Sequence, residues 1–172
     1  QLVEQVLSSL DGKILQAAGS GAGAGRGVFP DIDAAIAAAR GAHEQLMAGT
    51  LETRRQMVGA MRRAVQENLE RLADLAVRET GMGRRQDKVV KNKVAGEMTP
   101  GVEDLKPVTF SDDHGLTLVE RAPYGVVGSI TPSTNPTETI ISNAIGMIAA
   151  GNSVGFNPHP SAKSVSAFTI DL

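Results

Sequence analysis

The sequence of 172 residues contains no cysteine. This absence excludes disulfides, cysteine-based zinc sites and thiol catalysis within the segment. The three histidines, His43, His114 and His159, lie far apart without the spacing of metal ligands, so no metal site is expected. Long apolar runs and a basic, apolar N-terminal leader are also missing, so the sequence predicts neither a transmembrane helix nor a secretory signal.

An excess of charge of one sign is missing as well. Seventeen basic residues face 19 acidic ones, for a formal net charge of -2. The basic pairs, such as Arg54–Arg55 and Arg84–Arg85, lie among acidic neighbours and are typical of solvated helix faces. Nucleic acid is therefore not an expected partner, because binding to phosphate backbones needs a clustered surplus of Lys and Arg.

Residues 1–17 have apolar residues at helical spacing. Leu2, Val6, Leu10 and Ile14 fall on one face of the predicted helix. Because a helix this short is marginal alone in water, its apolar face needs a partner. The pattern fits a docking peptide; a disordered N-terminal arm or a self-associating helix fits it equally.

Residues 18–28 are rich in glycine and alanine, which is typical of a flexible linker. The stretch from Gly19 to Ala24 satisfies G-x-G-x-x-A. A dinucleotide-binding loop of that pattern needs a strand before it and a helix after it. Here an amphipathic helix precedes it and Gly-Arg-Gly follows, so we interpret it as linker.

Residues 29–172 are predicted to form a folded α/β unit that starts with helices. Asp31 or Asp33 can cap a helix through residues 33–49. Thr50 opens a second, longer helix that Gly81 and Gly83 end. A third helix crosses residues 87–105, with a break near Pro100–Gly101. Leu116 to Pro123 alternates apolar and polar residues, as a half-exposed antiparallel strand does.

The second half has a different pattern. Residues 126–130 and 153–156 are short apolar runs that predict strands buried on both faces. A helix over residues 138–150 lies between them, and another begins at Ser161. These elements predict a Rossmann-like βαβα unit with parallel strands and a right-handed crossover. Ligands of such sheets bind at the carboxyl ends of the strands, which places residues 131–136 and 157–160 in the candidate site.

Asn135 has two interpretations. It is a natural N-cap, with Pro136 at the first helical position and Glu138 completing a capping box. Alternatively, its side-chain NH2 donates to an oxyanion, and both roles can coexist because capping uses only the amide oxygen. His159, between two prolines, is either a surface histidine or a contact to an adenosine. Lys163 lies where the helix dipole disfavours a cation, which weakly suits an anion-binding role.

The stretch from Ala122 to Lys163 resembles the aldehyde dehydrogenase superfamily. The sequences PSTNP and PHPSAK are similar to its CoA-acylating branch, the propionaldehyde and acetaldehyde dehydrogenases of bacterial microcompartments. ETGMG, DKVVKN, TPGVEDL and GLTLVERAP also resemble that branch. The resemblance covers nearly everything after Phe29 and implies the aldehyde dehydrogenase fold in incomplete form.

The resemblance also implies an activity. Members of this branch bind NAD and CoA in turn; a cysteine thiolate attacks a short-chain aldehyde, hydride passes to NAD, and CoA takes the acyl group. By resemblance, Asn135 stabilises the oxyanion. Residues implied to line the nicotinamide side are Thr131, Pro132, Ser133 and Thr134, and those implied to meet the adenosine half are Asn157, Pro158 and His159.

The sequence departs from the superfamily pattern at several positions. Aligned proline to proline, the usual asparagine of the turn falls on Thr134, one place before Asn135. The usual ribose-binding lysine is Asn157 here, and its glutamate partner is Pro160. The nucleophilic cysteine is absent, so this segment alone is expected to be inactive.

The resemblance further implies surroundings and partners. We expect a cytoplasmic protein in the lumen of a bacterial microcompartment, with residues 1–17 as an encapsulation peptide that docks to a shell protein. A homo-oligomer, dimer or tetramer, is expected to form partly through the strand at residues 115–123. Two alternatives stay open: a non-catalytic truncated module that binds nucleotide or docks to a shell, and a reductase of phosphorylated substrates from the same superfamily.

Overall fold

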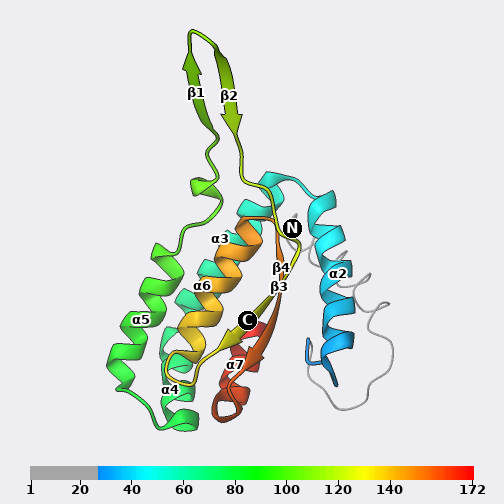
Figure 1. Ribbon diagram of the computed structural model, residues 1–172. Helices are drawn as coiled ribbons and strands as arrows, with labels where there is room; N and C mark the ends of the chain where they lie inside the picture. The colour runs from blue at the N-terminus through cyan, green and yellow to red at the C-terminus, as the bar shows by residue number, and fades with distance from the viewer. Residues whose placement is uncertain (1–26) are drawn as a thin grey trace, which may run out of the picture.

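The computed structural model describes residues 27–172 (Figure 1). The predicted docking residues Leu2, Val6, Leu10 and Ile14, and most of the predicted linker, lie outside the described residues. The described helices are α2 (Ile32–Ala48), α3 (Leu51–Glu67), α4 (Leu69–Thr80), α5 (Arg85–Met98), α6 (Pro136–Ala149) and α7 (Lys163–Asp171), with 3-10 turns at Val102–Asp104 and Pro160–Ala162. The strands are β1 (Val108–Asp112), β2 (Gly115–Val119), β3 (Val126–Thr131) and β4 (Ser153–Pro158).

Strands β3 and β4 form a parallel pair at the centre of the fold. Val126 pairs with Ser153 and Thr131 with Pro158, so both strands end at the same edge. Helix α2 lies on one side of this pair, and α6 with α3 and α5 lies on the other (Figure 1). The predicted parallel βαβα arrangement is confirmed, and the fold class is α/β.

Helix boundaries follow from local caps. Asp31 accepts a hydrogen bond of 2.8 Å from the Ala34 backbone N–H and begins α2. Thr50 and Thr53 cap each other's backbone N–H groups at the start of α3. Gly81, at φ 67°, ends α4 in the left-handed conformation that glycine favours. These predicted boundaries are confirmed.

The predicted long helix after Thr50 is wrong in one respect, because it breaks into α3 and α4 at Asn68. Asn68 has φ -119° and ψ 12°, and its side-chain NH2 donates to the Ala64 carbonyl at 2.9 Å. Asparagine competes with helical bonding in this way. The apolar periodicity continues through Asn68, so the sequence pattern does not reveal the break. The predicted break after α5 is confirmed, since Thr99 is extended before Pro100.

The main core lies between α3, α4 and α6. Its buried members are Val58, Val65, Leu72, Val102, Ile141, Ile145 and Ala149. Helix α5 approaches α3 closely at Gly96, where an added Cβ would lie 3.0 Å from Val65 Cγ1. The glycine therefore sets how closely α5 packs, and α5 in turn carries side chains to the start of α6.

The prediction that β3 is buried on both faces is wrong. Gly128 is exposed and Ile130 is 84% exposed. The described helices cover one part of the strand pair and leave these positions uncovered. Strand β4 is only partly buried beyond Ser153.

The predicted strand at Leu116 to Pro123 is shorter in the structure and has a partner strand that was not predicted. Strand β2 pairs with β1 in an antiparallel hairpin, with Val108 opposite Val119. Every residue of both strands is exposed, not half-exposed as predicted, because the hairpin projects away from the helices (Figure 1). Apolar side chains, among them Phe110, Leu116 and Leu118, thus face solvent on this ribbon.

Candidate active site

Two turns meet at the carboxyl ends of β3 and β4. The backbone N–H of His159 donates to the carbonyl of Thr131 at 3.0 Å, which joins the turns directly. The sequence-predicted residues 131–135 and 157–159 are therefore brought together at one edge of the strand pair. This is the place where parallel sheets bind their ligands.

The residues of this edge differ in accessibility. Pro132, Thr134, Asn157 and His159 are exposed, while Ser133, Asn135 and Pro158 are half-buried. Thr131 is only 1% exposed, and its hydroxyl has no hydrogen-bond partner among the described residues. A ligand at this edge would therefore meet the exposed turn residues first and the Thr131 side chain last.

His159 is tied to its own turn. It begins the 3-10 turn Pro160–Ala162, and its ring Nδ1 accepts from the Ser161 backbone N–H at 3.2 Å. An accepting Nδ1 carries no proton, so the neutral ring has its proton on Nε2. The exposed histidine thus offers an Nε2–H donor to a ligand.

Asn135 begins α6, but its side chain does not cap the helix. The Thr139 N–H bonds to the Asn135 backbone carbonyl at 3.1 Å, and no side-chain cap is formed. The predicted side-chain cap and capping box with Glu138 are therefore wrong. The ψ of 57° departs from the extended conformation of capping residues, and the side-chain Oδ1 instead accepts from Lys91 Nζ at 3.0 Å.

A buried polar cluster lies beneath Asn135. Lys88, 2% exposed, donates from Nζ to the Thr134 carbonyl at 2.9 Å and lies 3.7 Å from Glu138 Oε1. The Thr137 hydroxyl lies 2.7 Å from Asn92 Oδ1 and 3.0 Å from Glu138 Oε2. These contacts join the N-terminal half of α5 to the first turn of α6.

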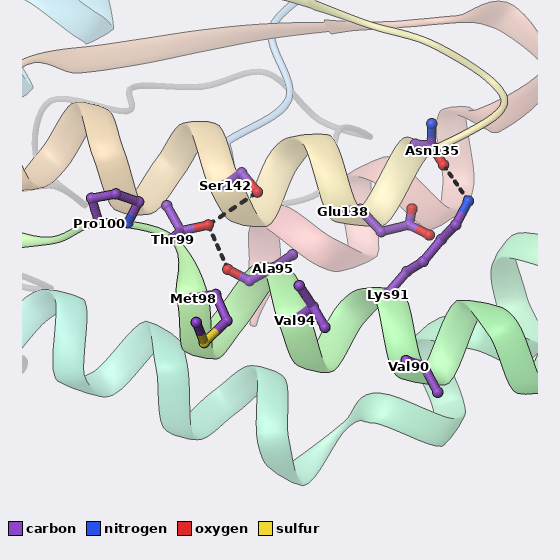
Figure 2. Close-up of a pocket in the computed structure, with 10 residues that line it drawn as sticks. All are labelled: Val90, Lys91, Val94, Ala95, Met98, Thr99, Pro100, Asn135, Glu138 and Ser142. Atoms are coloured by element: carbon purple, nitrogen blue, oxygen red, sulfur yellow. Dashed lines mark hydrogen bonds between the residues drawn. The ribbon is translucent and has the colours of Figure 1, made fainter.

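Asn135 also lies at one end of a groove between α5 and α6 (Figure 2). The groove has a volume of about 480 Å³. Val90, Val94 and Met98 line its α5 side and are more than half exposed. The groove has an apolar wall of α5 side chains and polar side chains at both ends, with Asn135 and Lys91 at one end and Thr99 and Ser142 at the other.

The α5 residues of this site were not predicted from the sequence. Lys88, Lys91 and Asn92 are spaced at i, i+3 and i+4, so one helix face carries them all. The spacing within DKVVKN indicates that the three polar side chains share one helix face. It does not indicate which other element that face contacts.

The backbone N–H groups at the start of α7 are already bound, and the weak anion-binding interpretation of the Lys163 side chain stays a prediction. The carboxylate of Glu79 already accepts from the backbone N–H groups of Ser164 at 2.8 Å and Val165 at 2.6 Å. This negative charge fills the N-terminal end of α7. A second anion at the same donors would be repelled.

Two features are absent from residues 27–172. No helix in this part of the chain has the length and apolar character needed to cross a bilayer. Within the same residues, His, Asp and Glu side chains form no group of three that would hold a metal ion.

Residues 24–172 match the model of the aldehyde dehydrogenase family. This chain belongs to the aldehyde dehydrogenase family. The aldehyde dehydrogenase chain is 52% identical over 146 residues to the acetylating acetaldehyde dehydrogenase EutE of Escherichia coli. It is 49% identical over 148 residues to the CoA-propanoylating propanal dehydrogenase of Salmonella typhimurium. These matches cover 85% and 86% of this chain but only 31% and 32% of the relatives, so the chain spans about a third of their length.

Solved structures agree with this relationship. The propionaldehyde dehydrogenase of Rhodopseudomonas palustris with bound CoA and an acylated cysteine superposes with a TM-score of 0.81 at 50% identity, over 86% of this chain and 34% of that one. An engineered glycolyl-CoA reductase with bound NADP+ gives 0.81 at 50% identity, over 87% and 34%. A propionaldehyde dehydrogenase from the fucose utilisation microcompartment of Clostridium phytofermentans gives 0.80 at 48% identity, over 84% and 33%.

Proposed function

We propose that this chain is the nucleotide- and oxyanion-binding part of a CoA-acylating dehydrogenase of short-chain aldehydes such as propionaldehyde or acetaldehyde. The observation that carries the proposal is the place of Asn135. Its amide lies where the strand-end turns meet the groove between α5 and α6, and its oxygen is already engaged by Lys91. The amide nitrogen remains as a donor for an oxygen that becomes negative during reaction.

In the proposed reaction, a cysteine thiolate adds to the aldehyde carbonyl, and the Asn135 NH2 donates to the resulting oxyanion. Transfer of hydride from that carbon to a bound nicotinamide would leave the acyl group as a thioester on the cysteine. The CoA thiol would then displace the cysteine thiol from the acyl group. The sequence contains no cysteine. Residues 1–172 alone are therefore expected to be inactive, and the nucleophile comes from another segment.

The strand-end turns supply the proposed nucleotide site. The nicotinamide side is assigned to residues 131–134 and the adenosine half to residues 157–159. The bond between His159 N and the Thr131 carbonyl fixes the two turns relative to each other, and Pro132 and Pro158 stiffen them. The Nε2–H of His159 and the amide of Asn157 are exposed donors that suit ribose or adenine acceptors. We propose NAD as the nicotinamide cofactor and CoA as the cosubstrate, both bound at these two strand-end turns.

The proposal predicts that the full-length gene product reduces NAD in the presence of propionaldehyde or acetaldehyde and CoA, with acyl-CoA as the product. Replacing Asn135 with alanine should lower kcat by about 10²–10³-fold, since loss of one oxyanion donor has that effect. Absorbance at the NADH band and chromatography of acyl-CoA measure both. An unchanged rate with lower thermal stability would make Asn135 structural. A gene product of 17.9 kDa that binds nucleotide without turnover would favour the non-catalytic module.

We also propose that residues 1–17 dock to a microcompartment shell protein and that the exposed β1–β2 hairpin joins subunits of a dimer or tetramer. A structural relative comes from such a compartment, and Phe110, Leu116 and Leu118 are exposed on the hairpin. Replacing Leu2, Val6 and Leu10 with glutamate should abolish co-purification with shells and leave the activity of the free enzyme unchanged. Equal packaging of the variant and the parent would contradict the docking assignment.

A further inference from the structure

Three polar side chains of α5 hold the turn that leads into α6. Lys88 Nζ donates to the Thr134 carbonyl at 2.9 Å, and Lys91 Nζ donates to Asn135 Oδ1 at 3.0 Å. Asn92 Oδ1 lies 2.7 Å from the Thr137 hydroxyl. One face of one helix therefore contacts both the backbone and the side chains around Asn135.

The contact from Lys91 decides which way the Asn135 amide points. An ammonium group has three donors and no acceptor, so the amide atom that faces it must be the oxygen. The amide NH2 then points away from Lys91. Because the cation withdraws electron density through the oxygen, it also makes the NH2 a stronger donor. Without Lys91, the amide loses the contact that distinguishes its two flipped orientations.

Lys88 fixes the backbone one residue earlier. It is almost fully buried, and its charge lies 3.7 Å from Glu138 Oε1. The bond to the Thr134 carbonyl holds the peptide group that connects directly to Asn135. The two lysines therefore restrain the turn at its main chain and at its amide.

The hydrogen bond from Lys91 to Asn135 is expected to contribute little to the stability of the fold. Lys91 is exposed, and hydrogen bonds or ion pairs of exposed lysines contribute little to the free energy of folding. The same contact has a larger effect on reaction, because misplacing a reacting group by about 1 Å lowers rates by as much as about 10²-fold.

We propose that Lys91 is a positioning residue that orients the Asn135 amide toward the reacting carbonyl oxygen, with Lys88 holding the backbone of the same turn. The proposal rests on the proposed function, because it assigns a task to Asn135 in acyl transfer. It adds residues of α5 that contact neither the aldehyde nor the nucleotide in that scheme.

The test compares variants of the full-length gene product by single-turnover formation of the acyl-enzyme with propionaldehyde and NAD. Lys91→Met keeps the length of the side chain and removes the donor, and Lys91→Arg keeps a donor without an acceptor. Lys93→Met is the matched control, since Lys93 is an exposed lysine of the same helix. We expect Lys91→Met to slow acylation by about tenfold or more, with an unchanged KM for NAD and an unchanged Tm. Lys91→Arg should recover most of the rate, and Lys93→Met should match the parent.

A double-mutant cycle with Asn135→Ala provides the decisive readout. If Lys91 acts only through the amide, Lys91→Met has no further effect once the amide is gone. Equal losses in the presence and absence of Asn135, or equal losses for Lys91→Met and Lys93→Met, would overturn the inference. A parent enzyme without CoA-dependent aldehyde oxidation would instead overturn the proposed function, so the two failures are distinguishable.

Discussion

The two ends of α6 are held in different ways. Its first turn carries Thr137 and Glu138, both buried, which face Lys88 and Asn92 of α5 through hydrogen bonds and an ion pair. Its later turns carry apolar side chains that pack against α3, α4 and the turn at Val102. These apolar residues are Ile141, Ile145 and Ala149.

The comparison separates two physical tasks. Apolar packing is non-directional and determines where the helix lies. A buried polar cluster is directional, so it determines how the adjoining turn is oriented. The cluster is not fully satisfied within residues 27–172, since Glu138 Oε1 and Asn92 Nδ2 have no hydrogen-bond partner there. The polar end of α6 therefore belongs to the candidate site, and the apolar end anchors the helix in the core.

The largest effect on stability is expected at the polar end. Glu138→Ala leaves the Lys88 charge buried without its carboxylate, which should lower the free energy of unfolding by about 3–5 kcal/mol. Urea denaturation of the full-length gene product measures this loss. The double variant Lys88→Met with Glu138→Leu removes both charges and should be much less destabilised. A double variant as unstable as Glu138→Ala would mean that shape, not the unpaired charge, is decisive.

A substitution at the apolar end of α6 should lower stability without changing the rate of acylation. Ile145→Ala opens a cavity in the core and should lower the free energy of unfolding by about 2–5 kcal/mol, while Ile145→Val should lose only about 0.5–1.5 kcal/mol. The rate of acylation per folded molecule should not change. Glu138→Ala, by contrast, should affect both stability and rate. A fall in the rate of the Ile145→Ala variant at temperatures where it is fully folded would break the distinction between the two ends.

The sequence was sufficient for features that depend on nearby residues. The caps at Asp31 and Thr50, the stop at Gly81 and the parallel strands with their turns all follow from local patterns. The break at Asn68 was missed because one residue changes direction without disturbing the apolar period. The exposure of Ile130 was missed because an apolar run does not reveal which elements will cover it.

The candidate site was predicted only in part, because local sequence patterns do not reveal contacts with distant elements. The turn at residues 131–135 is predicted from the sequence, but of the two interpretations of the Asn135 side chain, the local cap is not formed in the structure. Its partner is 44 residues away on α5. The spacing of Lys88, Lys91 and Asn92 indicated a shared face, and only the packing of α5 on α6 shows what that face holds.

An exposed ion pair between α3 and the 3-10 turn Val102–Asp104 contrasts with the buried pair and is expected to have the smallest effect on stability. Arg62 donates to Glu103 at 2.6 Å, and the Glu103 side chain is exposed. The hydrogen bond from Arg62, aided by the Glu103 and Gly101 backbone N–H groups, lowers the pKa of Glu103 below its usual value of 4.5. A lowered pKa means that the stabilisation is present above pH 4.5 and is lost as the pH falls through the lower value in the folded state.

Glu103→Gln should therefore be less stable than the parent at pH 7 by less than about 1 kcal/mol, because exposed pairs are screened by solvent. The difference should shrink as the pH falls below the usual carboxylate range and should also shrink in high salt. Urea midpoints of both proteins between pH 3 and pH 7 measure this trend. A difference that grew toward acid pH would have the wrong sign for a lowered pKa. A difference as large as that for Glu138→Ala would mean that burial does not separate the two ion pairs.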